Sequence, residues 1–289
     1  ANITVGKKIL RYFPSLSVLR RHPAPSRQQF DEFHASVGAI GFNLEFDNSK
    51  KLADSLDLAV RPDDPYFNKV LRIMATRCMQ PAQYFCSGQK PQEEWYHYGL
   101  AAPIYTHFTS PIRRYPDVIV HRLLAASLGV SPLPQNLMDK SYLHTLTENM
   151  NRRHRAAQMA GRASVAMHTS IYFRTNPTEE NGYVIRLNET KATVLVPRYG
   201  IEGKVQVPEG EKFCFDSEKM ILQGKRGTMF EDSKVQIYDI VRVRIFVPKK
   251  SNHSAVKMII VSPDLGFKAE SEGEVESEGD SGSRKKTKR

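Results

Sequence analysis

Cysteine, tryptophan and long apolar runs are all scarce in this sequence. Its 289 residues include one tryptophan and three cysteines, Cys78, Cys86 and Cys214. Because these thiols are few and irregularly spaced, they exclude a disulfide framework and a thiolate zinc site and are typical of a reduced, intracellular protein. No segment approaches the roughly 20 consecutive apolar residues of a membrane helix, and no signal peptide opens the chain. We therefore expect a soluble protein with no membrane partner.

Clustered carboxylates are lacking as well. Adjacent acidic residues occur as pairs in segments that are typical of loops or exposed helices: Asp31 with Glu32, Asp63 with Asp64, Glu93 with Glu94, and Glu179 with Glu180. A site for two divalent metal ions needs several ligands gathered on one surface. We therefore predict no metal-binding residues in this chain.

Positive charge is in excess, with a formal net charge of +11. Residues 266–289 carry six acidic and six basic side chains, so the excess lies in residues 1–265. Residues 101–175 alone carry nine lysines or arginines against three acidic residues. A basic protein of this kind favours a polyanionic partner, because neutralised phosphates release condensed counterions. Solvated charge that keeps the protein soluble explains the composition equally well.

Helical periodicity dominates residues 1–173, where Pro-rich segments separate the apolar repeats. The pattern predicts helices over residues 66–80 and 141–173. The longer helix also carries the basic cluster NRRHR at residues 151–155, which we interpret as a solvated face rather than the border of a nucleic-acid path. One face of it holds small side chains that would allow close helix packing: Ala156, Ala157, Ala160, Ala163 and Ala166.

Period-two alternation replaces helical periodicity from about residue 177 and predicts about five short strands. In residues 241–247 the apolar side chains alternate with Arg242, Arg244 and Phe246, as expected of a half-buried strand. Five strands in roughly 85 residues suit a small OB-type β-barrel, a fold whose open face commonly binds oligonucleotides.

Within this predicted barrel, residues 197–205 place Arg198, Tyr199 and Lys204 near a turn. Aromatic and cationic side chains together are typical of surfaces that bind single-stranded nucleic acid. A β-turn with incidental surface charge explains the same residues equally well. We therefore take these three residues as candidates for RNA binding.

The two periodicities predict an α+β chain with three parts: a mainly helical domain over residues 1–176, the barrel over 177–265, and a charged tail over 266–289. The tail lacks apolar periodicity, so we expect it to be disordered. Its end, RKKTKR, fits a nuclear localisation signal. The chain begins with alanine, and ANITVGKKIL is typical of the middle of a helix, so we expect further sequence to precede it.

The segment TSPIRRYPDVIVHR, residues 109–122, gives the clearest indication of a binding site. Ser110 and Pro111 form a helix-start signal, because a serine oxygen caps a free backbone N–H and proline suits the first helical position. Arg113 and Arg114 follow, although the positive end of a helix disfavours cations. Exposed N–H groups and two guanidinium groups together favour a bound anion, so the pattern predicts a phosphate site.

Asp117 and Pro116 decide the local geometry of this segment. Asp117 lies four and three residues after the two arginines, so it can pair with either of them, and His121 would extend the contacts. Pro116 disfavours a continuous helix, so we expect a turn that carries the arginines and then a helix from Pro116 to about Leu128. A purely structural alternative makes the arginines surface residues tied to Asp117.

The longer run HYGLAAPIYTHFTSPIRRYPDVIVHRLL, residues 97–124, resembles the signature of the RNase II (RNB) family of exoribonucleases, which degrade RNA from its 3′ end. The segments LRRHPAP, LRIMATRCMQPAQYFCSG and RASVAMHT are most similar to the eukaryotic type that serves as the catalytic subunit of the exosome. The resemblance covers nearly all of residues 1–265. It implies the C-terminal half of an RNB catalytic domain followed by an OB-type RNA-binding barrel, in agreement with both patterns above.

The resemblance also implies roles for individual residues. Arg113 matches the family arginine that contacts phosphate near the scissile bond, where it would stabilise charge in the transition state. Arg114, Ser110 and His107 occupy matching positions beside it and are candidates for RNA binding. The family cuts RNA with two Mg²⁺ ions held by aspartates. Those aspartates precede the region where this chain begins, so we expect Mg²⁺ as the cofactor, its ligands upstream of Ala1, and no hydrolysis by these residues alone.

Two functions are consistent with these features. The first is the C-terminal part of an exosome-type 3′-to-5′ exoribonuclease that binds single-stranded RNA, hydrolyses it processively with magnesium and releases nucleoside monophosphates. It implies exosome core subunits as partners and a nuclear location, extending to the cytoplasm. The alternative is an RNA-binding or scaffold module without catalysis. The sequence upstream of Ala1 would distinguish the two.

Overall fold

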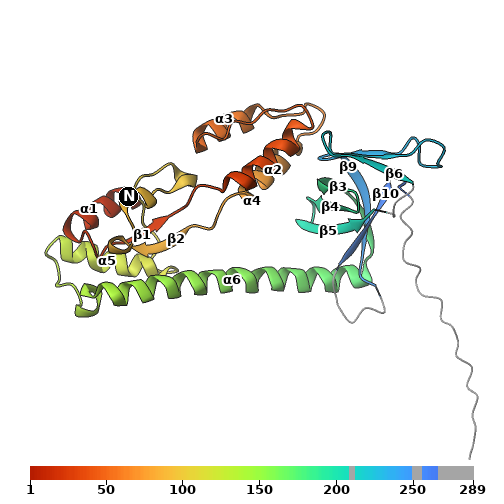
Figure 1. Ribbon diagram of the computed structural model, residues 1–289. Helices are drawn as coiled ribbons and strands as arrows, with labels where there is room; N and C mark the ends of the chain where they lie inside the picture. Colours follow the sequence, from red (N-terminus) through yellow and green to blue (C-terminus); the bar gives the residue numbers. More distant parts are fainter. Residues whose placement is uncertain (208–211, 249–255, 266–289) are drawn as a thin grey trace, which may run out of the picture.

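The computed structural model describes residues 1–207, 212–248 and 256–265, and it shows a helical part and a β part joined along one long helix (Figure 1). This helix, α6, runs over Lys140–Thr175, so the prediction of a helix over residues 141–173 is confirmed. The predicted α+β class is confirmed as well. The predicted disordered tail and its basic end lie outside the described residues.

The end of the helical part that lies farthest from the β part is built around the first turns of α6 (Figure 1). The other elements here are α1 (Asn2–Tyr12), α5 (Tyr115–Ser127) and the antiparallel strands β1 (Val18–Arg21) and β2 (Gln83–Cys86). Each contributes at least one fully buried side chain to a shared core: Ile9, Val18, Cys86, Ile119, Leu123 and Leu143. Four residues are too few for a clear period-two pattern, so the sequence does not predict β1 and β2.

Three further helices lie between this end and the β part: α2 (Arg27–Gly38), α3 (Ser49–Leu58) and α4 (Phe67–Arg77). The start of α3 is capped by Asn48, whose Oδ1 accepts a 2.9 Å hydrogen bond from the Lys51 N–H. The prediction of a helix over residues 66–80 is confirmed by α4, which ends three residues early. Pro81 explains a stop in this region, because the residue before a proline avoids the helical conformation.

The core of these helices continues into the β part. The Tyr238 ring is fully buried and meets the Phe67 ring edge to face, with 6.3 Å between centroids. Its hydroxyl lies 2.7 Å from the Ser36 Oγ, and burial raises the pKa of Tyr238 to about 12. A second link is the Tyr183 hydroxyl, which donates to the Asp64 carboxylate at 2.5 Å. These buried contacts fix the β part against α2, α4 and the loop before α4.

Five strands form the main sheet in the order β10-β9-β3-β4-β5, with every neighbouring pair antiparallel. The strands are β3 (Thr178–Leu187), β4 (Lys191–Val196), β5 (Ile201–Gln206), β9 (Ile240–Phe246) and β10 (Lys257–Ser262). The two edges approach each other at Gly203, where a Cβ atom would come within 2.5 Å of the Met258 sulfur. Glycine permits this close approach. The predicted five-stranded OB-type barrel is therefore confirmed, as an antiparallel half-barrel.

A second sheet contains β6 (Phe213–Asp216), β7 (Ile221–Gly224) and β8 (Lys234–Gln236). The period-two patterns do not predict this separate sheet. The alternation runs on through residues 192–207 and 235–248, but the structure divides each of these segments into two strands, because the chain turns at Gly200 (φ 63°) and Tyr238 (φ 65°). The alternation predicted for residues 241–247 is confirmed: the apolar side chains are buried and both arginines are exposed.

The middle of α6 is exposed from residue 152 to residue 168 (Figure 1). Residues 152–155 of the basic cluster are exposed, as both a solvated face and the border of a nucleic-acid path require. The five alanines predicted to allow close helix packing are exposed too, so the expected close packing of another helix on this face is wrong for the described residues. The helix connects two separate cores, so the side chains of its middle turns are exposed. Among the described residues, no helix has the length and apolar character needed to span a bilayer.

Candidate nucleic-acid interface

The two arginines of the motif lie in a turn that immediately precedes α5. The Ser110 carbonyl oxygen accepts hydrogen bonds from the Arg113 N–H at 3.2 Å and the Arg114 N–H at 3.1 Å. α5 begins at Tyr115, with Pro116 in its first turn, so the predicted turn followed by a helix is confirmed. The expected capping role of the Ser110 side chain is wrong, because the residue at the N-cap of α5 is Arg114. The helix starts later than the serine signal suggests.

Asp117 decides which arginine is fixed. Its side chain is completely buried, and Oδ1 accepts hydrogen bonds from the Ser110 N–H at 2.8 Å and from Arg114 Nη2 at 2.7 Å. Arg113 is exposed, and no acidic side chain among the described residues pairs with it. The Arg114 guanidinium is thus held against the protein, while that of Arg113 remains available to an anion.

His121 does not extend the contacts of Asp117 as predicted. Its Nε2 lies 2.9 Å from the Phe108 carbonyl oxygen, and its ring stacks on the Phe108 ring with 4.3 Å between centroids. The imidazole therefore supports the segment that leads into the turn. Because Asp117 is fully buried and His121 exposed, the two side chains lie in different environments despite their helical spacing.

His107 is half-buried beside the turn, and its Nδ1 lies 2.7 Å from the Tyr84 hydroxyl. Burial lowers the pKa of His107 to about 4, and the positive charges of Arg20 and Arg114 act in the same direction. The ring is neutral at pH 7, so it can offer RNA a hydrogen bond but no positive charge.

Tyr84 is itself fixed by the long helix. The Tyr84 N–H donates to Asn151 Oδ1 and the Tyr84 carbonyl oxygen accepts from Asn151 Nδ2, each at 2.8 Å. Asn151 belongs to the basic cluster that we interpret as solvated, and it is the member that instead faces the protein. Through this pair, α6 positions β2 and the Tyr84 side chain beside His107.

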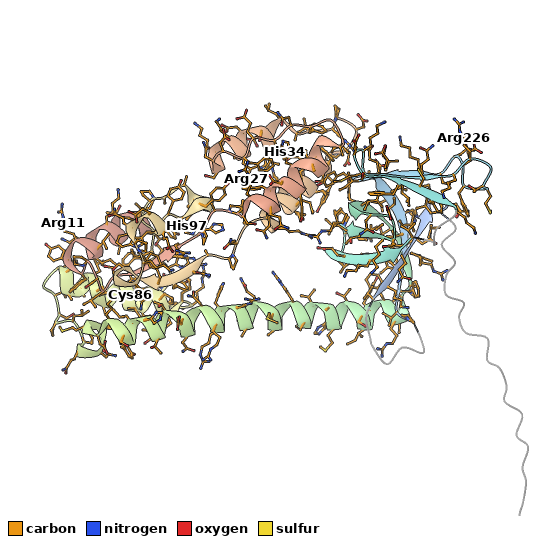
Figure 2. The ribbon with its side chains drawn as sticks, in the orientation of Figure 1. Arg11, Arg27, His34, Cys86, His97 and Arg226 are labelled. Atoms are coloured by element: carbon orange, nitrogen blue, oxygen red, sulfur yellow. The ribbon has the colours of Figure 1, made fainter. Side chains whose placement is uncertain are left out.

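A row of rings leads away from His107. Its centroid lies 5.7 Å from that of Tyr105, which lies 5.0 Å from that of His97, labelled in Figure 2, and His97 lies 5.2 Å from His22. Burial lowers the pKa of His97 to about 4 as well. These side chains meet edge to face and form a neutral aromatic wall on one side of the site. Three of its members, His97, Tyr105 and His107, lie in the run over residues 97–124, but the sequence does not show that their rings contact one another or His22.

Arg20 on β1 is a further residue that sequence reasoning missed. Its guanidinium carbon lies 4.5 Å from the centre of the Tyr84 ring, a cation–π contact. Burial lowers the pKa of Arg20, and the nearby charge of Arg114 contributes to the shift. Arg20 lies in the segment LRRHPAP, but the sequence does not indicate which of its two arginines faces the site. The structure does: Arg21 pairs instead with Glu94.

The candidates on the β part lie in a different place. Arg198 is exposed and pairs with Glu180, and the Tyr199 ring meets the Phe173 ring edge to face at 5.0 Å. Phe173 is near the C-terminal end of α6, whereas Asn151 marks the site around Arg114. At about 1.5 Å per residue, the helix between these residues is roughly 33 Å long. Lys204, on β5, is exposed and belongs to the same distant surface.

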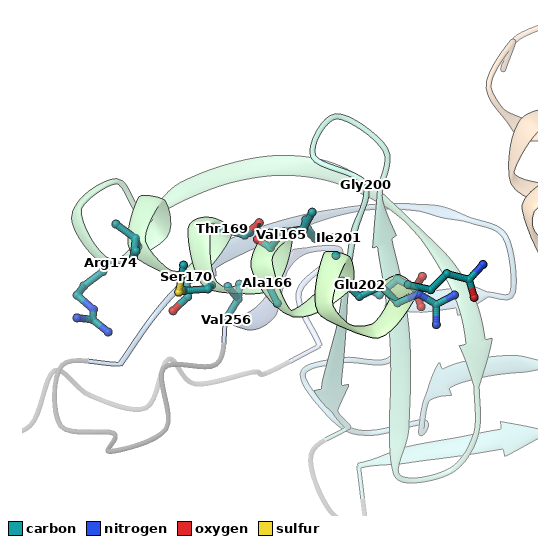
Figure 3. Close-up of a pocket in the computed structure, with 14 residues that line it drawn as sticks. Val165, Ala166, Thr169, Ser170, Arg174, Gly200, Ile201, Glu202 and Val256 are labelled. Atoms are coloured by element: carbon teal, nitrogen blue, oxygen red, sulfur yellow. Dashed lines mark hydrogen bonds between the residues drawn. The ribbon is translucent and has the colours of Figure 1, made fainter. Parts of the chain in front are cut away.

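A groove of about 940 Å³ lies between α6 and the turn from β4 to β5 (Figure 3). Val165, Ala166 and Thr169 of α6 line one wall, and Gly200 and Ile201 line the other. Gly200 directly follows Arg198 and Tyr199 in the chain, and the groove borders the exposed part of α6. No pattern in the sequence predicts it, because its walls come from a helix and a turn that meet in space.

The described residues do not provide a metal site. No three His, Cys, Asp or Glu side chains gather there as ligands. Asp117 is a single carboxylate that accepts bonds from Arg114 and Ser110 through Oδ1, whereas its Oδ2 is buried and has no hydrogen-bond partner. The three cysteines are free thiols, with Cys78 and Cys86 buried and Cys214 exposed. The residues present thus fit a phosphate group better than a divalent cation.

Comparison with protein families gives two matches along the chain. Residues 1–129 match the RNB domain, and residues 178–259 match the S1 domain of Rrp44. The first region contains the turn with both arginines, and the second contains most of the half-barrel.

Curated relatives match over most of the chain. Exosome complex exonuclease RRP44 homolog A of Arabidopsis thaliana is 56% identical over 234 residues, which cover 79% of this chain and 25% of the relative. Exosome complex exonuclease dis3 of Schizosaccharomyces pombe is 40% identical over 268 residues, which cover 90% of this chain and 28% of the relative. The chain therefore spans about a quarter of the length of these relatives.

Two solved structures share the fold. Yeast Ssd1, described as a pseudonuclease, superposes with a TM-score of 0.74 at 18% identity, over 90% of this chain and 43% of that one. Mycoplasma genitalium RNase R in complex with ribose-methylated single-stranded RNA gives a TM-score of 0.70 at 21% identity, over 90% and 40%. The arrangement of a helical part, a long helix and a half-barrel is thus shared beyond recognisable sequence similarity.

Proposed function

Because the chain belongs to the RNB exoribonuclease family, of the exosome Rrp44/Dis3 type, we propose that it is the C-terminal part of a 3′-to-5′ exoribonuclease. In this proposal the enzyme binds single-stranded RNA, hydrolyses it processively with magnesium and releases nucleoside monophosphates. The RNB portion covers residues 1–176 and the RNA-binding barrel residues 177–265. The exosome core supplies the protein partners, and the enzyme acts in the nucleus and also in the cytoplasm.

The observation that carries the proposal is the unequal treatment of the two arginines. Asp117 holds Arg114 against the protein, whereas Arg113 is exposed beside it without an acidic partner among the described residues. A guanidinium presents a planar fork of donors that matches two phosphate oxygens. We assign to Arg113 the contact with the phosphate near the scissile bond, where it stabilises the charge that develops during hydrolysis.

The neighbouring residues bind and orient the RNA in this proposal. Arg114 presents a fixed positive charge, and Ser110 and His107 contribute hydrogen bonds at the edge of the site. Because the pKa of His107 is about 4, its contribution is that of a neutral ring at physiological pH. On the barrel, Arg198, Tyr199 and Lys204 contact the RNA strand farther from the reacting phosphate, by cationic attraction and stacking.

Magnesium is the cofactor that the family implies, and it would activate the attacking water and stabilise the leaving oxygen. The described residues do not fit such an ion, since Asp117 is engaged by Arg114 and no carboxylate cluster surrounds it. We therefore assign no step of the reaction through the metal to these residues. Their part is to bind the phosphate and hold the strand.

RNA binding by the 289-residue chain tests the proposal directly. We expect fluorescence anisotropy to show binding of a single-stranded RNA that weakens steeply with added salt, because phosphate contacts release counterions. A duplex RNA of the same length is the matched control and should bind more weakly, since stacking on Tyr199 needs unpaired bases. Equal affinity for both RNAs, or no affinity for either, would contradict the proposal.

A binding or scaffold module without catalysis is the second candidate. It is favoured by the fold shared with Ssd1, which is described as a pseudonuclease, so this architecture occurs without nuclease activity. Both candidates predict RNA binding, and hydrolysis separates them. Magnesium-dependent release of nucleoside monophosphates by the full-length parent would support the enzyme, and its absence would support the module.

A further inference from the structure

Arg20 is a partly buried cation whose charge is not matched by an acidic side chain. Among the described residues no carboxylate lies within ion-pair distance of it, whereas its neighbour Arg21 pairs with Glu94. One of its nitrogen atoms, Nη1, is inaccessible to solvent and has no hydrogen-bond partner. Burying a charge without a partner costs free energy, so such a group indicates a missing counter-charge.

The surroundings of Arg20 make the site more positive. Burial is the main cause that lowers the pKa of Arg20, and the positive charge of Arg114 acts in the same direction. Three arginines and one aspartate, Asp117, leave two uncompensated positive charges around the turn. The histidines contribute no charge that would change this sum at neutral pH, because the pKa values of His97 and His107 are about 4.

Arg20 cannot easily turn away from this position. Its guanidinium stacks over the Tyr84 ring at 4.5 Å, and hydrogen bonds to Asn151 hold the Tyr84 backbone from both sides. The backbone N–H of Arg20 also donates to the Tyr105 carbonyl oxygen at 2.8 Å. A guanidinium held in this way loses little conformational freedom when it binds an anion.

Arg114 offers a matching donor. Its Nη2 bonds to Asp117, whereas its Nε is buried and has no partner. We propose that Arg20 and Arg114 bind one backbone phosphate of single-stranded RNA between them, next to the phosphate assigned to Arg113. This inference rests on the proposed function and adds Arg20 to its binding residues.

The cation–π contact with Tyr84 offers a purely structural explanation of Arg20. It accounts for the position of the guanidinium, since aromatic faces attract cations. It leaves Nη1 and the Nε of Arg114 without partners, however, and it supplies no negative charge to compensate the two guanidinium groups. A bound phosphate would supply that charge.

The test compares Arg20→Gln with Arg21→Gln in the 289-residue chain. Both variants remove one positive charge from the same strand, but the Arg21 side chain is engaged by Glu94. We expect Arg20→Gln to weaken single-stranded RNA binding several-fold at low salt and to reduce the slope of log affinity against log salt by about 0.7, the value for one phosphate contact. Arg21→Gln should leave the slope unchanged. An Arg20→Gln chain with the affinity and slope of the wild type would overturn the proposal.

Arg20→Lys is a control that separates loss of the charge from a disturbed fold. Lysine keeps the charge, so we expect it to retain the salt slope even where affinity falls. If Arg20→Lys loses the slope together with Arg20→Gln, the residue acts through the packing of Tyr84 and the proposal is wrong. Unfolding temperatures of all three variants show whether the chain remains folded.

Inorganic phosphate separates this inference from the proposed function. We expect phosphate to raise the unfolding temperature of the wild type and of Arg21→Gln more than that of Arg20→Gln, with chloride at equal ionic strength as the reference. If the wild type binds no RNA but shows this effect, the RNA function fails while the anion site stands. If phosphate stabilises all chains equally, the site between Arg20 and Arg114 is refuted.

Discussion

The Asp117 carboxylate accepts a 2.7 Å hydrogen bond from Arg114 and, through the same oxygen, a 2.8 Å bond from the backbone N–H of Ser110. This oxygen therefore ties the first residue of the turn to its last arginine. Because Asp117 is completely buried, the turn is fixed from inside the protein, and Arg113 is left exposed. Arg114 is thus the fixed arginine of the turn and Arg113 the available one.

Asp117→Asn should destabilise the chain. The amide keeps the shape of the side chain but removes the charge that compensates Arg114, and breaking a buried pair costs about 3 kcal/mol. Urea denaturation measures the change. Asp57→Asn is the matched control, because Asp57 pairs with Arg72 at an exposed position and should cost no more than about 1 kcal/mol. Similar losses from both variants would show that the Asp117 pair has no special weight.

Arg113→Ala should separate catalysis from binding in the full-length parent. Loss of a donor that acts on the transition state lowers turnover by about 10²–10³-fold, with a much smaller change in RNA affinity. Arg122→Ala is the control, since Arg122 is exposed on α5 outside the turn. Single-turnover hydrolysis and equilibrium binding measure the two effects. Equal losses in both would contradict the role assigned to Arg113.

Lys204→Ala should have the opposite profile in the same full-length parent. Lys204 is exposed on β5, far along α6 from the arginine turn, so its removal should weaken RNA binding and leave turnover of bound RNA unchanged. The salt slope of binding should fall by about 0.7. Lys191→Ala, exposed at the start of β4, provides a control of equal charge. If Lys204→Ala lowers the rate of single-turnover hydrolysis of bound RNA, the assignment of binding to the barrel and catalysis to the turn is wrong.

Asn151→Ala should disturb the site from the long helix. It removes both 2.8 Å hydrogen bonds to the Tyr84 backbone and leaves buried polar groups unpaired, which costs about 1–3 kcal/mol. Because Tyr84 positions His107, RNA affinity should fall as well. Asn149→Ala, whose side chain accepts a bond from exposed Arg152, should change stability by no more than about 0.5 kcal/mol. Chemical denaturation measures the unfolding free energy of both variants. Equal values would show that Asn151 does not anchor Tyr84.

Acid should destabilise the chain through its buried histidines. The pKa values of His97 and His107 are about 4 in the folded protein, below the roughly 6.5 of an unfolded chain. The unfolded state therefore binds more protons between these values, so stability is full above about pH 6.5 and is lost as pH falls toward 4. His107→Gln should make the slope of unfolding free energy against pH shallower, because up to one proton fewer is taken up on unfolding. His168→Gln, at an exposed helical position, is the control. Denaturation at pH 7, 6 and 5 measures the slope, and identical slopes for wild type and His107→Gln would refute the prediction.

Local patterns in the sequence predict the elements that depend on neighbours in the chain. The long helix α6 follows from continuous 3.6-residue periodicity, and the turn before α5 follows from Pro116. The half-barrel follows from period-two alternation. The patterns are less informative where the chain reverses without a strong signal, as at Tyr238, whose positive φ is supported by the buried contact with Ser36.

The sequence by itself determined the classes of element and the presence of two arginines in a turn before a helix, because these depend on residue type and short spacing. The tertiary structure alone decided that Asp117 takes Arg114 rather than Arg113, since both spacings suit a helical pair. It also brought Arg20 and Tyr84 to the turn, because antiparallel pairing of β1 with β2 joins segments that are far apart in the chain. Side-chain spacing is a local property, whereas burial and register are set by the packing of the whole protein.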